Sequence, residues 1–425
     1  MVIAPSQSLT KPDVCETQQI RLTSQILHIG SSVSRLNPFE YVQAGKFVYL
    51  PDQESLAQTL RQRGALNDYI HRIKDREDIS TLLEKTLGDK WWTAQDEDGA
   101  AIFPKTQRSL KWTTQRITDL RPMIRNGFGH HYIPGSSIKG AIRTAIAYHL
   151  LKHADTYRVP KANRVSAIED RLRQSMGDLR RKAKFADDRL FMDELFSNYG
   201  LTYQGRNART RQGPNTDIMR AVSVSDSAPL IEERIQREGK RPLFRNLSVV
   251  NEVIVSSRFP DYRAKYRASI YAELAFNVRT QFTLSVDHEM LSWFHHQKGM
   301  KLPFQSVEDL LQICQGFAQE QWDFEHDYWA AVQNNPEAQG RNLDFDHIRN
   351  LYEPQTCPHT LRLGWGSGLR GTTVNLCLPD ELIKEVRDTC GIAAPGFEAP
   401  KSRRTIMNSQ GEIRYVPGWV KLETI

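Results

Sequence analysis

The order in which strands and helices follow one another constrains the fold of this chain more than any other feature. Alternating apolar residues predict a first strand over 20–29, and apolar residues at helical spacing predict a helix over Ser136–Lys152. Two strands follow at Leu247–Val255 and Ser269–Val286, and a second helix is predicted over 306–333. A strand segment returns after that helix, so the chain is predicted to be an α+β protein.

This order resembles βαββαβ, the ferredoxin-like pattern, whose antiparallel sheet is also the scaffold of the RNA recognition module. Shorter strands are expected at Lys46–Leu50 and Met219–Val224, and we expect the strand over 269–286 to be interrupted near Asn277. Residues 155–215 are rich in arginine and lysine, and this composition predicts an inserted, partly flexible segment.

Length and charge limit the function classes that this chain can belong to. Its 425 residues are enough for two or three domains, and 57 Lys and Arg against 50 Asp and Glu give a net charge of +7. This balance excludes a strongly acidic protein and permits a polyanion such as nucleic acid as a partner. The 5 scattered cysteines indicate a reducing compartment, and no apolar run suits a signal peptide or a membrane span. We therefore expect a soluble cytoplasmic protein.

The start of the helix predicted after residue 135 could bind an anion. Ser136 or Ser137 can cap it, and its first backbone N–H groups are unpaired. Lys139 and Arg143 are four residues apart and therefore lie on one helix face. A capped amphipathic helix with solvated cations is the alternative interpretation. A Walker A phosphate loop is excluded, because the lysine precedes Gly140.

A second loop is rich in glycine. Gly366, Gly368 and Gly371 match G-x-G-x-x-G, but the sequence behind them, at 372–374, favours a strand rather than the helix of a dinucleotide site. The glycines indicate a backbone that something approaches closely. Trp365 offers a stacking face and Arg370 a cation, and both suit a nucleic-acid strand. A plain hairpin turn is the alternative.

Other candidate residues carry weaker signals. His28 and the pair at 130–131 could be general bases, but no carboxylate lies at a spacing that would fix them. Cys357, His359 and Cys377 lack the spacing of zinc ligands, so neither a metal nor any other cofactor is expected. The tail holds a basic cluster that could bind phosphate, made of Lys401, Arg403 and Arg404.

Four stretches, taken in order, resemble the RAMP superfamily of CRISPR-associated proteins, which have a ferredoxin-like core and RNA-binding glycine-rich loops. They are Leu27–Gly30, Tyr132–Gly140 with Arg143, Met219–Asp226 and Gly364–Gly371. The resemblance implies two RAMP-type domains. The first would be 1–260, with insertions at about 53–125 and 155–215, and the second 261–425, with the glycine-rich loop and the basic tail.

Within the superfamily, three further stretches resemble the subunits that cap the type III-A effector complex at the 3′ end of the guide RNA. They are Asn37–Val42, Pro400–Arg404 and Pro417–Leu422. The resemblance implies an RNA-binding subunit of this ribonucleoprotein, with roles in guide RNA maturation and antiviral defence. Its partners would be the guide RNA, the neighbouring backbone and small helical subunits, and a host trimming nuclease, with no membrane involved.

The resemblance also implies which residues contact RNA and which chemistry to expect. The expected RNA-binding residues are His28, Gly30, Ser136, Ser137, Lys139, Arg143, Arg220, Trp365, Gly366, Gly368, Arg370, Gly371, Lys401, Arg403 and Arg404. Backbone subunits cleave target RNA with an aspartate in the loop after the first strand, but here that loop has only Glu40 and Asp52, in other contexts. We therefore expect no catalytic residue and no enzymatic activity.

Two alternatives remain open. One is a metal-independent endoribonuclease that processes the guide RNA precursor, with His28, His130 or His131 as general base. The other is a different subunit of the superfamily, which binds the 5′ tag of the guide RNA.

Overall fold

The computed structural model describes residues 14–182, 192–208, 210–392 and 394–425. A mixed sheet of 12 strands runs through this part of the chain, and its main path is β16-β19-β1-β12-β11-β4-β3-β2. The predicted α+β class is therefore confirmed. None of the helices in the described ranges is long and apolar enough to cross a membrane.

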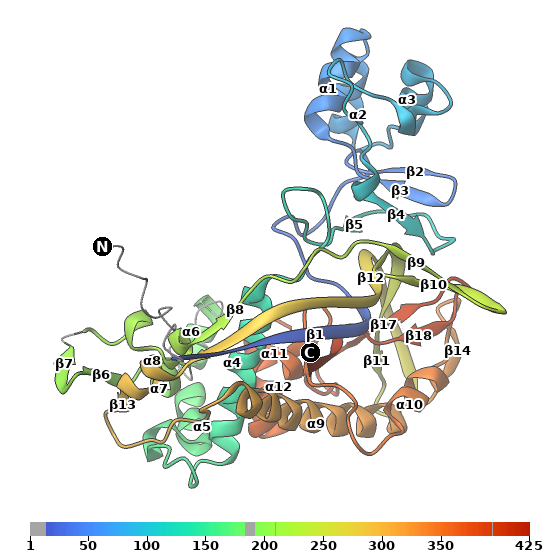
Figure 1. The fold of residues 1–425 in the computed structure, drawn as a ribbon. Coiled ribbons are helices and arrows are strands. Elements are labelled where there is room, and N and C mark those ends of the chain that lie inside the picture. The colour runs from blue at the N-terminus through green and yellow to red at the C-terminus, as the bar shows by residue number, and fades with distance from the viewer. Residues whose placement is uncertain (1–13, 183–191, 209, 393) are drawn as a thin grey trace, which may run out of the picture.

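Four strands form the centre of the sheet, and all neighbours among them are antiparallel. In spatial order they are β19 (Trp419–Thr424), β1 (Cys15–Leu27), β12 (Ala264–Asp287) and β11 (Leu247–Arg258). Most of β1 pairs with the second half of β12, and all of β11 pairs with the first half. β12 therefore joins the two ends of the molecule, as Figure 1 shows.

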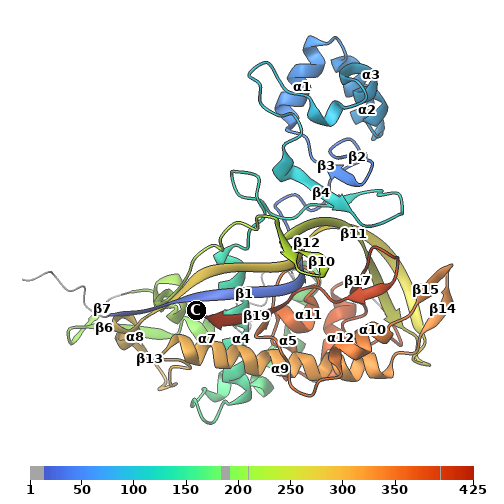
Figure 2. The same ribbon diagram turned by 45° about the vertical axis from the view of Figure 1, so that its right-hand side comes forward.

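Two long helices cover one face of these strands. α4 (Gly135–Lys152) lies between β1 and β11 in the chain, and α9 (Val307–Ala331) lies between β12 and β19. Ile138, Ile142 and Ala145 of α4 are fully buried in the main core, together with apolar residues of β1, β12 and α9. Figures 1 and 2 both show α9 running along the sheet below β1. The two helices predicted from apolar spacing are confirmed.

A helical lobe stands off the body at one edge of the sheet (Figure 1). It contains α1 (Gln53–Gln62), α2 (Leu66–Asp75) and α3 (Ser80–Leu87), which pack around the buried Trp91 in a small core of their own. The lobe joins the sheet through β2 (Val42–Ala44), β3 (Phe47–Tyr49) and β4 (Arg108–Lys111), of which β4 runs parallel to β11. β5 (Leu120–Arg121) then pairs with Tyr271 and Ala272, in the first half of β12.

The basic segment 155–215 forms much of a second lobe at the far end of β12. Its elements are α5 (Val165–Gln174), α6 (Met176–Lys182), α7 (Asp193–Phe196), β6 (Tyr199–Tyr203) and β7 (Arg206–Ala208). Nearby lie β8 (Val222–Val224), α8 (His288–Trp293) and β13 (Phe294–His296). Residues 183–191 and 209 of the predicted insertion lie outside the described ranges.

The remaining elements belong to the hairpin before β11 and to the C-terminal quarter of the chain. They are β9 (Glu233–Arg237), β10 (Lys240–Arg245), β14 (Asn335–Ala338), β15 (Arg341–Leu343), α10 (Asp346–Tyr352), β16 (Leu361–Arg362), α11 (Gly368–Thr372), α12 (Asp380–Thr389), β17 (Arg403–Met407) and β18 (Ile413–Tyr415). β17 pairs with β11, and β19 pairs with β1.

Three local predictions are wrong. β12 is continuous through Asn277, which keeps its place in the strand with a φ of 50° by donating a side-chain hydrogen bond to the carbonyl of Phe244. Only 222–224 of the strand predicted over 219–224 is extended, because the side chain of Asp217 caps a helical turn directly before it. The strand predicted at 372–374 is replaced by the end of α11.

The predicted boundary between residues 260 and 261 falls in the tight turn that joins β11 to β12, where Arg258 pairs with Ala264. The division into two domains at this point stays a prediction.

Candidate nucleic-acid interface

Residues from separate segments meet at the end of β1. The rings of His28 and Trp365 lie edge to face, with their centres 5.3 Å apart. The guanidinium carbon of Arg404, on β17, lies 4.8 Å from the centre of the Trp365 ring, and that of Arg121, at the end of β5, lies 5.3 Å from it. We call His28, Arg121, Trp365 and Arg404 the Trp365 cluster. It combines an aromatic ring with two cations.

The glycine-rich loop, Gly364–Gly371, positions the tryptophan. The Trp365 N–H donates to the carbonyl of His28 at 2.9 Å. Gly364 has a φ of +74°, and a Cβ there would lie 2.3 Å from the same carbonyl oxygen. At Gly366, with a φ of +105°, a Cβ would lie 2.5 Å from Cγ of Pro417. Side chains are therefore excluded here by the protein itself, and the glycines allow the loop to pack against the end of β1.

The cluster has an excess of positive charge. In the part of the chain that the structure describes, no carboxylate lies within 4.0 Å of the guanidinium of Arg121 or Arg404, and both Nε atoms are buried without a hydrogen-bond partner. The pKa of Arg404 is lowered by burial and by the charges of Arg121 and Arg362. An anion bound here would offset this repulsion, because it would supply the missing opposite charge.

A buried carboxylate holds the base of the cluster in place. Glu273 of β12 accepts two hydrogen bonds from Arg125, at 2.7 and 2.6 Å, and others from the Ser109 hydroxyl and the Met123 N–H. Burial alone would raise the pKa of Glu273, but the charge and the hydrogen bonds of Arg125 hold it well below its usual range. The network therefore fixes residues 122–125, which directly follow β5 and its Arg121, against the centre of the sheet.

Glu273 also fixes the tautomer of His28 through its backbone carbonyl. Its Nδ1 lies 2.6 Å from the carbonyl oxygen of Glu273, and because a carbonyl only accepts, Nδ1 carries the proton. Burial lowers the pKa of His28 to about 4, despite the opposing effect of Glu273. Its Nε2 lies on the side of Gly30, where an added Cβ would be 3.9 Å away. His28 is therefore a neutral, buried ring at pH 7.

The other two histidines differ from each other. Burial, followed by the charge of Arg125, lowers the pKa of His131, whose Nε2 has no hydrogen-bond partner and lies 3.6 Å from Glu273. His130 is half-buried on the neighbouring turn.

The start of α4 differs from the predicted anion site. Pro134 occupies the N-cap position and makes no side-chain cap hydrogen bond, so the predicted capping by Ser136 or Ser137 is wrong. The Gly135 N–H instead donates to the carboxylate of Asp226 at 2.8 Å. An Asp226 oxygen therefore already lies where a phosphate oxygen was expected.

The basic residues of α4 do not join the Trp365 cluster. Nζ of Lys139 donates to the carbonyl of Val222 at 2.7 Å. Arg143 forms an ion pair with Asp217. Arg220 is exposed and donates to the backbone carbonyl of Asn215, in the turn before its own. Lys139 and Arg143 therefore stabilise the contact between α4 and the segment around β8.

Two of the arginines expected at the RNA surface lie inside the protein. Arg370 is 4% exposed and pairs with Asp380, and Arg403 is 6% exposed and pairs with Glu325 at 3.0 Å. Arg403 faces the helix side of the sheet because side chains alternate along a strand, and its neighbour Arg404 faces Trp365. The expectation that all three tail cations are available to RNA is therefore wrong for Arg403.

The remaining predicted RNA-binding residues, Gly368, Gly371 and Lys401, differ in how much space surrounds them. A Cβ at Gly371 would meet Gln321 and Ser367 at 3.0 Å, whereas Gly368, with a φ of +71°, has open space beside it. Lys401 is half-buried. Of the predicted residues, the structure brings His28, Gly30, Trp365, Gly366 and Arg404 together.

Sequence reasoning missed Arg121, Arg125 and Glu273. The available signal was Glu273, a carboxylate among the apolar residues of a predicted strand. A charge in such a position is almost always paired, so a partner arginine could have been sought. Among the described residues, no group of three or more His, Cys, Asp or Glu side chains could hold a metal ion.

Comparisons with known proteins agree with this fold. The family model described as the RAMP superfamily matches residues 19–316. Among curated proteins, the chain is 26% identical over 162 residues to the "CRISPR system Cms protein Csm5" of Enterococcus italicus. That match covers 32% of this chain and 46% of the relative, so it spans about half of the relative's length.

Two solved structures share the fold over nearly the whole chain. One is a chain of the cryo-EM structure of a Csm–crRNA–target RNA ternary complex of a type III-A CRISPR-Cas system, with a TM-score of 0.61, 23% identity, and coverage of 96% of this chain and 100% of that chain. The other is the crystal structure of T. onnurineus Csm5, with a TM-score of 0.54, 18% identity, and coverage of 95% and 100%.

Proposed function

The chain belongs to the RAMP superfamily, and from this premise we propose that it is a non-catalytic RNA-binding subunit of a type III-A CRISPR effector complex. It binds the 3′ region of the guide RNA and caps the backbone filament, and so takes part in guide RNA maturation and antiviral defence. The likeness to Csm5 from Enterococcus italicus and T. onnurineus supports this assignment.

The order of the central strands supports a ferredoxin-like core. β1, α4, β11, β12, α9 and β19 follow one another in the chain, and the strands lie in the order β19-β1-β12-β11 with every neighbour antiparallel. This is the arrangement expected of a βαββαβ unit with its two helices on one face. In this proposal the helical lobe and the 155–215 segment are insertions into that unit.

The Trp365 cluster is the observation that carries RNA binding. Single-stranded nucleic acid is held by cations that follow the backbone and by aromatic rings on which bases stack. Arg121 and Arg404 supply charge that no described carboxylate neutralises, and Trp365 lies between their segments. Phosphate contacts carry no base information, so a site of this kind accepts guides of any sequence.

Burial of His28 and His131 supports a role without catalysis. A general base must reach the proton that it removes, and its pKa should lie near the working pH. His28 is 2% exposed with a pKa of about 4, and His131 is 5% exposed. The alternative of a metal-independent endoribonuclease is tested by incubating the pure protein with labelled repeat RNA in the presence of a chelator. Cleavage that disappears in His28→Ala would contradict the proposal.

The partners follow from the same assignment. The similar chain in the cryo-EM structure is part of a complex with crRNA, target RNA and other Csm subunits, so we propose the guide RNA and the adjacent backbone and small helical subunits as neighbours. A host trimming nuclease is proposed as a transient partner, on the resemblance alone.

One crosslinking experiment tests where the chain lies on the guide. The effector is assembled from its cognate subunits on guide RNAs that carry a photoreactive nucleotide near either the 5′ or the 3′ end. The proposal predicts that this chain crosslinks to the 3′ probe. A crosslink to the 5′ probe alone would assign it instead to the subunit that binds the 5′ tag.

A further inference from the structure

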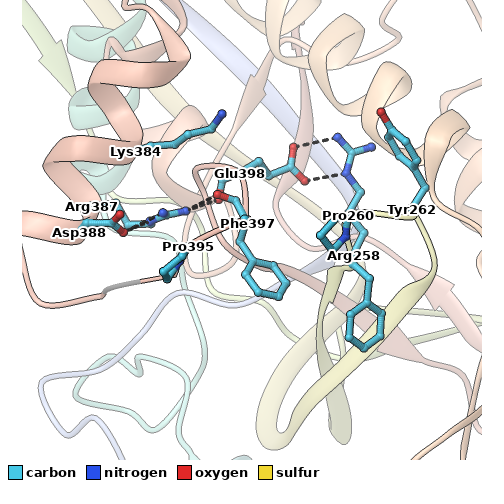
Figure 3. Close-up of a pocket in the computed structure, with 11 residues that line it drawn as sticks. Arg258, Pro260, Tyr262, Lys384, Arg387, Asp388, Pro395, Phe397 and Glu398 are labelled. Carbon is cyan, nitrogen blue, oxygen red and sulfur yellow. Dashed lines mark hydrogen bonds and ion pairs between the residues drawn. The ribbon is translucent and has the colours of Figure 1, made fainter.

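A cavity of about 360 Å³ opens beside the turn between β11 and β12 (Figure 3). Both of its carboxylates are already neutralised: Glu398 pairs with Arg258 at 3.1 Å, and Asp388 pairs with Arg387 at 2.7 Å. Lys384 extends from α12 toward Glu398, yet no carboxylate of the described residues lies within 4.0 Å of its Nζ. The lining of the cavity therefore carries a net positive charge.

Two more cations of β12 lie next to this cavity, each over an aromatic ring. Nζ of Lys265 is 4.7 Å from the ring centre of Phe259 and 5.7 Å from that of Phe397. The guanidinium carbon of Arg267 is 4.5 Å from the Phe397 ring centre. Phe259 and Phe397 also line the cavity. We call Phe259, Lys265, Arg267, Lys384 and Phe397 the turn patch.

Of the two β12 cations in the turn patch, Arg267 keeps a hydrogen-bond donor without a partner, and neither cation is neutralised by a described carboxylate. Arg267 donates from Nε to the hydroxyl of Ser257 at 2.8 Å, but its buried Nη2 has no hydrogen-bond partner. Neither Lys265 nor Arg267 has a carboxylate within 4.0 Å in the part of the chain that the structure describes. A buried N–H without a partner costs free energy, and a ligand oxygen would recover it.

Lys265 of the turn patch lies on the same face of the sheet as Arg404. On β11, Val255 pairs with Arg404, and Ser257 pairs with Lys265. Residues two apart on a strand point to one face, and directly paired residues point to that face as well. Val255 and Ser257 are about 7 Å apart along the strand. A bound strand that leaves the Trp365 cluster along β17 would therefore reach Lys265 within a short distance.

We propose that the turn patch is a second contact for the same single-stranded RNA, with one nucleotide entering the cavity between Phe397 and Lys384. This inference rests on the proposed function and adds a direction to it, because the RNA would run from the Trp365 cluster toward the β11–β12 turn. Cations interleaved with aromatic rings fit a strand that offers phosphates and bases in turn. A protein partner would fit less well, because of the large apolar residues exposed in the described chain only Tyr262 lies at this turn.

The test compares salt titrations of single-stranded RNA binding by the full chain. Lys265→Ala with Lys384→Ala removes two cations that make no ion pair among the described residues, so folding should be preserved. Each phosphate that is no longer neutralised lowers the slope of log K against log salt by about 0.7 for a single strand, so the slope of the double variant should be smaller by about 1.4. Arg206→Ala with Arg211→Ala is the matched control, because both arginines are exposed in the distant lobe.

Arg267→Ala is a second variant, and it should weaken binding and lower the slope by about 0.7. If Lys265→Ala with Lys384→Ala binds RNA like the control while Arg121→Ala with Arg404→Ala binds it more weakly, the turn patch is overturned and the proposed function stands. If neither double variant changes the affinity for RNA, both the turn patch and the proposed RNA binding at the Trp365 cluster are overturned. If Lys265→Ala with Lys384→Ala binds RNA normally but the assembled effector loses a neighbouring subunit, the turn patch is a protein contact and the proposal is overturned.

Discussion

The guanidinium carbon of Arg404 lies 4.8 Å from the centre of the Trp365 ring, although the two residues belong to segments that pair with different strands. β17 brings Arg404 along β11, and the glycine-rich loop brings Trp365 to the end of β1. The cation and the ring are thus held by the backbone rather than by a flexible tail. A site of this kind is preorganised, which reduces the entropy cost when a strand binds.

Replacing Trp365 tests the stacking contribution separately from charge. Stacking of a base on an aromatic side chain contributes about 1–3 kcal/mol, so Trp365→Ala should weaken single-stranded RNA binding by roughly 5- to 150-fold. Trp365→Phe should have a smaller effect, since it keeps an aromatic face. Fluorescence anisotropy with a labelled oligonucleotide measures both. The salt slope should remain as in the unaltered protein, and a changed slope would mean that Trp365 acts through the arginines.

Alanine substitutions at two glycines with similar φ angles distinguish the cost of backbone strain from the cost of a steric clash. Gly364 and Gly368 have φ values of +74° and +71°, but only at Gly364 would a Cβ meet an atom, the His28 carbonyl oxygen at 2.3 Å. Alanine in this left-handed conformation costs about 1 kcal/mol at either site. Gly364→Ala should be destabilised by a further ~1–3 kcal/mol from overpacking. Urea unfolding of the two variants measures the difference, and equal destabilisation would show that the loop can move away from β1.

The buried His28 makes stability depend on pH. Its pKa falls from 6.5 to about 4 on folding, so the unfolded chain binds the proton more readily than the folded one. The contribution of neutral His28 to the free energy of unfolding is fully present above pH 6.5. It is lost as the pH falls from 6.5 toward 4, and the loss reaches about 3 kcal/mol.

His28→Gln keeps a donor for the Glu273 carbonyl and removes the titration. Its free energy of unfolding should therefore change less between about pH 7 and pH 5 than that of the unaltered protein. Urea unfolding at several pH values gives both curves. Parallel curves would show that His28 does not titrate in this range.

Local patterns of the sequence were enough to predict the central elements. β1, α4 and α9 carry apolar residues at a spacing that matches their burial, and the order of these elements with β11 and β12 points to the class of the fold. The sequence also indicates that something approaches the glycine-rich loop closely, and it favours a nucleic-acid strand in that place. What approaches Gly364 and Gly366 is the protein's own backbone and Pro417, which are distant in sequence.

The rest depended on long-range contacts that no local pattern encodes. Arg370 and Arg403 have polar neighbours in the sequence, yet both are buried. Their charges are paired with Asp380 of α12 and Glu325 of α9 respectively. Arg121 looked like any surface arginine, and only the pairing of β5 with β12 brings it to Trp365. The start of α4 looked free to bind an anion because Asp226 lies about ninety residues later.

RNA binding at the Trp365 cluster depends, in this proposal, on two cations without a carboxylate partner. Arg121→Ala with Arg404→Ala removes both of them and leaves the ion pairs among the described residues intact. A charge-assisted hydrogen bond contributes roughly 1.5 kcal/mol, so affinity should fall about tenfold for each arginine that is removed. Arg206→Ala with Arg211→Ala serves as the control of equal charge.

The decisive measurement is the slope of log K against log salt for single-stranded RNA, taken for the unaltered chain, the cluster variant and the control variant. We expect a slope that is smaller by about 1.4 in the cluster variant, since two phosphates are no longer neutralised, and an unchanged slope in the control. The same affinity and the same slope in all three proteins would contradict RNA binding at this cluster.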